Sequence, residues 1–68
     1  MTIGKKIKQI RTEKGFSQDY IYSNQSLVSQ IEQGVNKNPN EMILRQMAQK
    51  LEVAFDELIE GTDWETPR

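Results

Sequence analysis

Uncharged amide and hydroxyl side chains cluster between residues 25 and 33, and they carry the clearest chemical signal in this chain. The cluster comprises Gln25, Ser26, Ser29, Gln30 and Gln33. Each can donate and accept hydrogen bonds, and one glutamine amide can do both along the edge of an adenine. Val28 and Ile31 are three residues apart and would face inward if this segment is helical. The pattern is typical of a short helix that presents polar groups for contact with base edges.

The composition argues against catalysis. The chain has 68 residues, no histidine and no cysteine, so it lacks the commonest general base and any thiolate ligand. It has no glycine-rich phosphate loop and no metal-ligand cluster. We interpret Asp56, Glu57 and Glu60 as carboxylates near the start of a helix rather than as a cation site. We therefore expect no enzyme activity, no cofactor and no metal.

The same features limit the compartment and the partners. No apolar run approaches the roughly 20 residues that a membrane-spanning helix needs, and the N-terminus shows no secretory signal pattern. We expect a cytoplasmic protein without membrane contact. The core of so short a chain leaves little room for a small-molecule pocket, and none is evident.

The charge is divided unevenly along the chain. The net charge is −1, but residues 1–40 carry six basic residues against three acidic ones, and residues 41–68 carry three against seven. A chain with one basic half can present a positive face to phosphate despite its acidic total. Ordinary solvated surface is the plainer interpretation of the same distribution, and of Lys5, Lys6 and Lys8 in particular.

Capping residues and apolar spacing predict the first three helices. Thr2 caps a helix over residues 3–14, where Ile3 and Ile7 begin an apolar face and Gly15 ends the helix. Ser17 caps a short helix at about 18–22. The polar pair at 23–24 forms a turn or a new cap for a helix at about 25–33, which ends at Gly34.

The second half predicts a loop and two more helices. Residues 35–40 form the loop, and Asn40 caps a helix whose apolar stripe is wide enough to face a core. A fifth helix covers about 55–60 and begins after a poor cap, Ala54. No strand pattern appears. We expect an all-α, compact bundle of about five short helices, with a domain at 1–61 and a C-terminal tail at 62–68.

Four segments, in this order and spacing, resemble the Cro/repressor-type, or Xre-like, helix-turn-helix family of DNA-binding proteins. They are residues 3–11, 14–18, 28–34 and 51–58. The Asn38-Pro39 loop is similar to that of SinR-type repressors in particular. The resemblance implies a lambda-repressor-like domain, bound as a homodimer to an inverted-repeat operator in double-stranded DNA.

The resemblance also implies roles for single residues. Gln18 would hydrogen-bond a phosphate, and Gln30, Lys37 and Asn38 would hold the flanking backbone. Base edges would be read at the start of the third helix, with Leu27 near a thymine methyl. Arg11 and Glu32 would form a partly buried ion pair between the first and third helices. The full set of implied DNA contacts is Gln18, Asn24, Gln25, Ser26, Leu27, Ser29, Gln30, Lys37 and Asn38.

Plainer interpretations stay open at these positions. Gln18, Gln25 and Ser29 could be ordinary exposed polar residues, and Arg11 and Glu32 could each make only surface contacts. The stretch between the second and third helices is also shorter than in the family by about one turn, or about 3.6 residues. Tyr22 stands where the family has a small residue. The second helix is therefore expected to be shortened, which affects the transfer of Gln18 most.

Two functions follow from these observations. The first is a sequence-specific DNA-binding regulator, most simply a repressor of phage or plasmid type, whose third helix lies in the major groove. The second is a protein-interaction module of the same fold, an antirepressor or antitoxin-like partner without DNA binding. Met42, Phe55, Ile59 and Trp64 are candidates for a dimer contact. For Phe55 core packing is the plainer interpretation, and for Trp64 a tail docked on its own chain.

Overall fold

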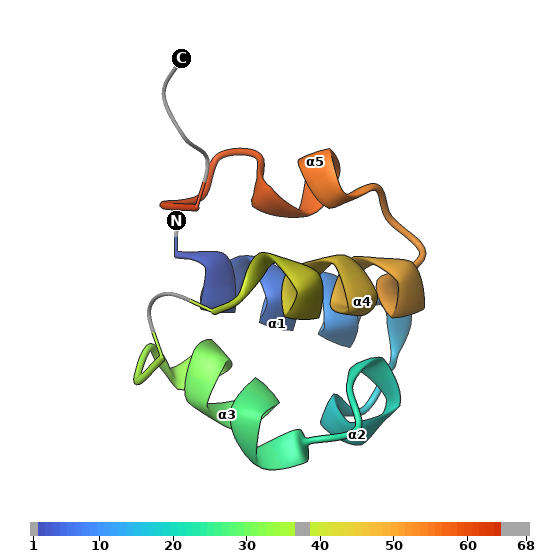
Figure 1. Cartoon of the computed structure of the whole chain (residues 1–68). Helices are drawn as coiled ribbons and strands as arrows, with labels where there is room; N and C mark the ends of the chain where they lie inside the picture. The colour runs from blue at the N-terminus through green and yellow to red at the C-terminus, as the bar shows by residue number, and fades with distance from the viewer. Residues whose placement is uncertain (1, 37–38, 65–68) are drawn as a thin grey trace.

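The protein is an all-helical bundle arranged in three levels, as shown by the computed structural model, which describes residues 2–36 and 39–64. In Figure 1, α5 lies above α1 and α4, and α2 and α3 lie below them. The described residues contain five helices and no strand, which confirms the predicted fold class. Their bounds are α1 Ile3–Lys14, α2 Gln18–Ile21, α3 Gln25–Gln33, α4 Glu41–Leu51 and α5 Phe55–Ile59.

Local caps set most of these bounds. The Thr2 side chain accepts a hydrogen bond from the Lys5 backbone N–H, and Gly15 ends α1 in the left-handed conformation, as predicted. Asn24 and Asn40 cap α3 and α4 in the same way, by accepting bonds from backbone N–H groups in the first turn. Each bond satisfies an N–H that the helix leaves without an internal partner.

Two predicted details differ from the structure in part. Ser17 stands at the N-cap position of α2, as predicted, but its side chain makes no capping bond, and its hydroxyl donates to the Asp19 carboxylate at 2.6 Å. Helices α2 and α5 also each end one residue earlier than predicted, since Tyr22 and Glu60 leave the helical conformation.

The apolar core lies at the centre of the bundle and takes buried side chains from all five helices. Val28 and Ile31 of α3 are fully buried, as their spacing predicts. Helix α3 is thereby fixed by one face, and its other face is left free. The buried apolar side chains are Ile3, Ile7, Ile21, Val28, Ile31, Leu44, Met47, Ala48, Leu51 and Leu58.

Gly4 permits a close contact between α1 and α3. A Cβ atom added to Gly4 would collide with the backbone carbonyl of Ile31 in α3. Only glycine allows the start of α1 to approach the α3 backbone at this distance. The approach fixes where the C-terminal half of α3 lies.

Residues 60–64 close the bundle over the start of α1. Asp63 accepts a hydrogen bond from the Ile3 backbone N–H at 2.9 Å, and Lys6 Nζ donates to the Glu60 carbonyl at 3.2 Å. The Trp64 ring packs edge-on against Phe55. Residues 65–68 lie outside the described residues, so the division into a domain at 1–61 and a tail at 62–68 stays a prediction. No helix in the described part of the chain is long and apolar enough to cross a membrane.

Candidate nucleic-acid interface

The outer face of α3 and the start of α2 form one continuous polar surface. Gln25, Ser26 and Gln30 are exposed, and Gln18 and Ser29 are half-buried. Together these five side chains line a shallow, open hollow. The structure therefore brings together side chains that the sequence separates by up to 12 positions, and it places none of them in the core.

The turn between α2 and α3 positions this surface. Tyr22 is extended, and Asn24 then caps α3 by accepting the Leu27 backbone N–H through its side-chain oxygen at 3.2 Å. The amide nitrogen of Asn24 is the part of this side chain that the cap does not use. Leu27 is half-buried and packs partly against the core, so only part of it faces outward.

A partly buried ion pair between α1 and α3 lies beneath this polar surface. The Arg11 guanidinium contacts both Glu32 oxygens, through Nε at 2.8 Å and Nη2 at 3.0 Å. Only 13% of the Arg11 side chain and 3% of the Glu32 side chain are exposed, which confirms the prediction of a partly buried pair. Arg11 Nη1 also donates to the Phe16 carbonyl at 2.9 Å, so it fixes the segment that enters α2.

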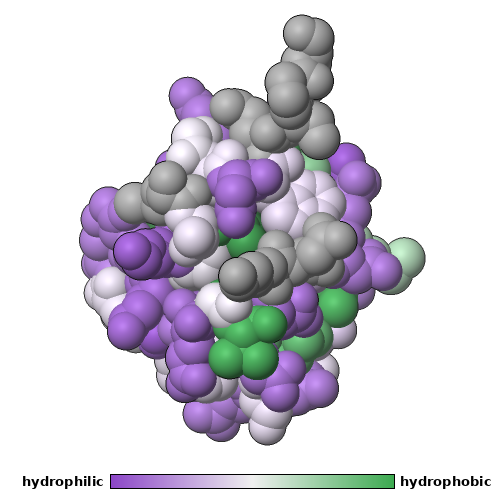
Figure 2. All heavy atoms as spheres, turned by 90° about the vertical axis from the view of Figure 1, so that its left-hand side faces the viewer, coloured by the Kyte–Doolittle hydropathy of each residue, from purple (hydrophilic) through white to green (hydrophobic). Residues whose placement is uncertain are grey.

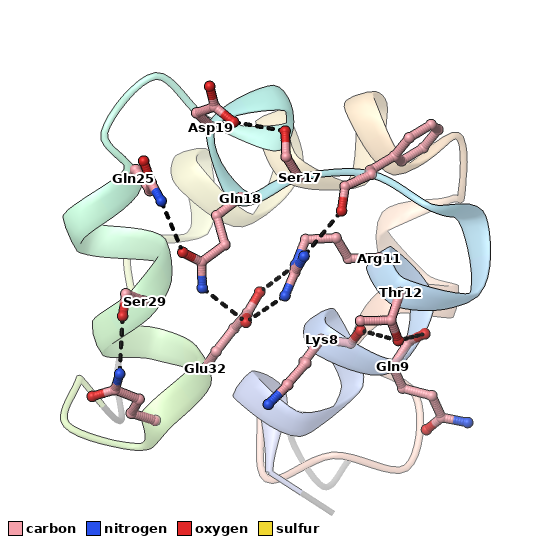
Figure 3. Close-up of polar contacts among 12 residues, drawn as sticks. Lys8, Gln9, Arg11, Thr12, Ser17, Gln18, Asp19, Gln25, Ser29 and Glu32 are labelled. Carbon is pink, nitrogen blue, oxygen red and sulfur yellow. Dashed lines mark hydrogen bonds and ion pairs between the residues drawn. The ribbon is translucent and has the colours of Figure 1, made fainter.

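A chain of hydrogen bonds connects this ion pair to the exposed surface (Figure 3). Gln18 Nε2 donates to Glu32 Oε1 at 3.2 Å, and Gln25 Nε2 donates to Gln18 Oε1 at 3.3 Å. The chain runs from α1 through the end of α3 and the start of α2 to the start of α3. We call this chain of Gln25, Gln18, Glu32 and Arg11 the amide relay. The sequence did not predict the amide relay, because its two glutamine bonds join residues 7 and 14 positions apart.

Ser29 is held by its own helix. Gln33 Nε2 donates to Ser29 Oγ at 3.0 Å, so the Ser29 hydroxyl proton remains available to an outside acceptor (Figure 3). Lys37 and Asn38, the remaining two predicted contacts, lie outside the described residues. Pro39, which follows them, is buried.

The acidic residues of α5 and its C-terminal end lie away from this surface. Asp56, Glu57 and Glu60 belong to α5 or follow it, and Figure 1 shows α5 on the opposite side of the α1–α4 level from α3. The carboxylates of α5 therefore do not adjoin the polar face of α3, whereas Asp19 of α2 lies beside Gln18. Within residues 2–36 and 39–64, no group of acidic residues is arranged to hold a metal ion.

Comparison with known families identifies the arrangement. The family model described as helix-turn-helix matches residues 7–58, which cover α2, α3 and their turn and extend into α5. No curated protein matched the chain. The matched span contains the ion pair and the whole amide relay.

Proposed function

Because the chain belongs to the helix-turn-helix family of DNA-binding regulators, we propose that it is a sequence-specific repressor that reads the major groove with α3. The single observation that carries this proposal is the polar face of α3, held outward by a fully buried apolar face. An α-helix of this width fits the major groove of B-form DNA, where each base pair presents a distinct pattern of donors and acceptors. Members of this family are typically not enzymes, in line with the missing histidine and cysteine.

Gln25 is the proposed base-reading residue. It stands at the first position of α3, exposed, and its amide is held by Gln18 rather than free to rotate. A glutamine with a fixed amide loses less rotational freedom on binding, so more of its hydrogen-bond energy appears as affinity. Ser26 and Ser29 would read neighbouring bases, and the outward part of Leu27 would contact a thymine methyl.

The residues around this reading face would hold the phosphates. Gln18 uses one amide proton on Glu32 and keeps the second for an outside acceptor. The amide nitrogen of Asn24, together with Gln30, Lys37 and Asn38, would complete the backbone contacts. Such contacts fix the register of α3 in the groove without selecting a sequence. The placement of the α5 carboxylates on the far side removes a source of repulsion.

A homodimer on an inverted-repeat operator completes the proposal. One helix of nine residues contacts only a few base pairs, and two copies related by twofold symmetry double the length of DNA that is read. Half-sites of such operators lie about one helical turn apart. Repression would follow from occupying the operator and excluding other proteins from it. The cytoplasmic compartment remains part of this proposal.

Selection of bound sequences from a random DNA library, at two salt concentrations, tests the proposal. We expect an inverted repeat to be enriched and affinity to fall steeply with salt, with a log–log slope near −0.9 per phosphate contacted. Binding without any salt dependence, or no binding, would instead favour the interaction module of the same fold, an antirepressor or antitoxin-like partner.

Gln25→Ala tests direct readout on the selected operator. We expect a loss of about 1–3 kcal/mol at the matched site, with relaxed preference at one base position. Gln46→Ala, an exposed glutamine on α4, is the matched control and should leave the preference unchanged. If Gln25→Ala weakens binding to every sequence equally, Gln25 contacts the backbone and not a base.

A further inference from the structure

The Glu32 carboxylate determines which amide atoms donate and which accept along the amide relay. An ionised carboxylate has no proton to give, so Glu32 can only accept hydrogen bonds. Glu32 Oε1 accepts from both Arg11 Nη2 and Gln18 Nε2 (Figure 3). The Gln18 amide is therefore forced to turn its nitrogen inward and its oxygen outward.

The same constraint passes on to Gln25. Because Gln18 presents an oxygen, Gln25 must donate to it through Nε2, and these two atoms are 3.3 Å apart. Gln25 then has its Oε1 and one remaining N–H for the groove. This pair matches adenine, which offers the N6 amino donor and the N7 acceptor in the major groove. It does not match guanine, whose O6 and N7 both accept.

We propose that Glu32 is a positioning residue for sequence recognition, which sets the hydrogen-bond polarity of Gln25 and so selects adenine over guanine at one operator position. This inference rests on the proposed DNA-reading function. Glu32 touches no base itself. It acts through Gln18, and its burial at 3% exposure keeps water from supplying a substitute donor.

Glu32→Gln tests this proposal because an amide can donate where the carboxylate cannot. With a donor at position 32, Gln18 is free to turn over, and Gln25 is then free to point both N–H groups at the base. The affinities of wild type and variant are compared on the selected operator and on the same operator with guanine at the position that Gln25→Ala identifies. We expect wild type to prefer adenine by about tenfold or more, and Glu32→Gln by less than about threefold.

Two control variants separate polarity from stability and charge. Arg11→Lys loses the two-pronged contact with Glu32 but keeps the carboxylate, so we expect lower stability with an unchanged adenine preference. Glu13→Gln makes the same chemical change on the exposed face of α1 and should alter affinity for both operators equally. A folded Glu32→Gln protein that keeps the full adenine preference would overturn the proposal and leave the DNA-reading function intact.

A measurement without DNA covers the case in which Glu32→Gln does not fold. Nuclear magnetic resonance of the wild-type protein reports hydrogen exchange of each glutamine side-chain amide. We expect at least one Gln18 amide proton to exchange about tenfold more slowly than those of the exposed Gln46. Equal exchange would show that the inward bond to Glu32 is not maintained, and the proposal would fail. Slow exchange in a protein that does not bind DNA would preserve the relay and reject the function.

Discussion

At the scale of single residues, Glu52 adopts a backbone conformation that its residue type disfavours. It ends α4 with φ of 63°, and among the described residues it is the only non-glycine with positive φ. A side chain with a Cβ is strained in this left-handed conformation by about 1–2 kcal/mol. Its negative charge also sits at a helix C-terminus, where the helix dipole disfavours it.

Glu52→Gly should therefore stabilise the protein. Glycine adopts positive φ without steric cost, although it gives back some of the gain through a more flexible unfolded chain, so we expect about 0.5–1.5 kcal/mol. Urea denaturation followed by circular dichroism measures the change. Glu57→Gly, inside α5, is the control and should lose about 1 kcal/mol. A Glu52→Gly protein no more stable than wild type would show that Glu52 makes a compensating contact.

Single residues also show how far the sequence predicts the candidate site. The types and spacing of Gln25, Ser26 and Ser29 were enough to predict an exposed polar helix face, because that depends only on local periodicity. The pairing of Arg11 with Glu32 came from family resemblance. The bond from Gln18 to Glu32 followed from neither, since it depends on how α2 packs against the end of α3.

At the scale of the elements, prediction succeeded where a boundary is set by its own neighbours in sequence. Asn24, Asn40, Gly15 and Gly34 end or begin helices by local bonds and local φ, and those bounds were predicted correctly. Ser17 begins α2 as predicted, although its hydroxyl donates to Asp19 and makes no capping bond. Local periodicity predicted no contact between elements, and the fit of Gly4 against α3 is the clearest example.

Gly4→Ala compares local helix propensity with the packing of α1 against α3. Alanine favours the helical conformation over glycine by about 1 kcal/mol, so the substitution would be stabilising in an isolated helix. Here the added methyl collides with the Ile31 carbonyl, and a backbone atom cannot move without shifting α3. We expect a net loss of about 1–3 kcal/mol in the free energy of unfolding.

The exposed Gln9→Ala in the same helix is the control for Gly4→Ala and should be neutral or slightly stabilising. Chemical denaturation of both variants measures the difference. A Gly4→Ala protein as stable as the Gln9→Ala protein would mean that α1 and α3 separate at little cost. DNA binding by such a protein would then show how much of the α3 position the reading function needs.

At the scale of the whole molecule, its size and surface limit how two copies can meet. The longest extent of the Cα trace is 33 Å, and half-sites one turn apart are separated by about 34–36 Å. Two copies on adjacent half-sites would therefore contact each other only through residues at the ends that face each other. The face in Figure 2 is mostly hydrophilic, with apolar side chains in small separate patches. A face of this kind offers no large apolar area for a permanent dimer.

Among the predicted dimer contacts, Met42 is the strongest candidate because its side chain is exposed. It is 67% exposed at the start of α4, whereas Phe55 and Trp64 pack against each other. We expect Met42→Lys to reduce the cooperativity of binding to a two-site operator by about tenfold, because it places a charge in the contact. Affinity for a single half-site should change little, since substitutions at exposed positions stay within about 0.5 kcal/mol.

Titration of DNA with one and with two half-sites measures this cooperativity directly. Gln9→Lys adds the same charge on the polar face of α1 and corrects for any general gain in attraction to phosphate. Because the free chain should sediment as a monomer at micromolar concentration, the effect must appear only on the two-site DNA. Unchanged cooperativity in Met42→Lys would exclude Met42 from the dimer contact. The contact would then be assigned to Ile59 and Trp64, near the place where residues 60–64 close over α1.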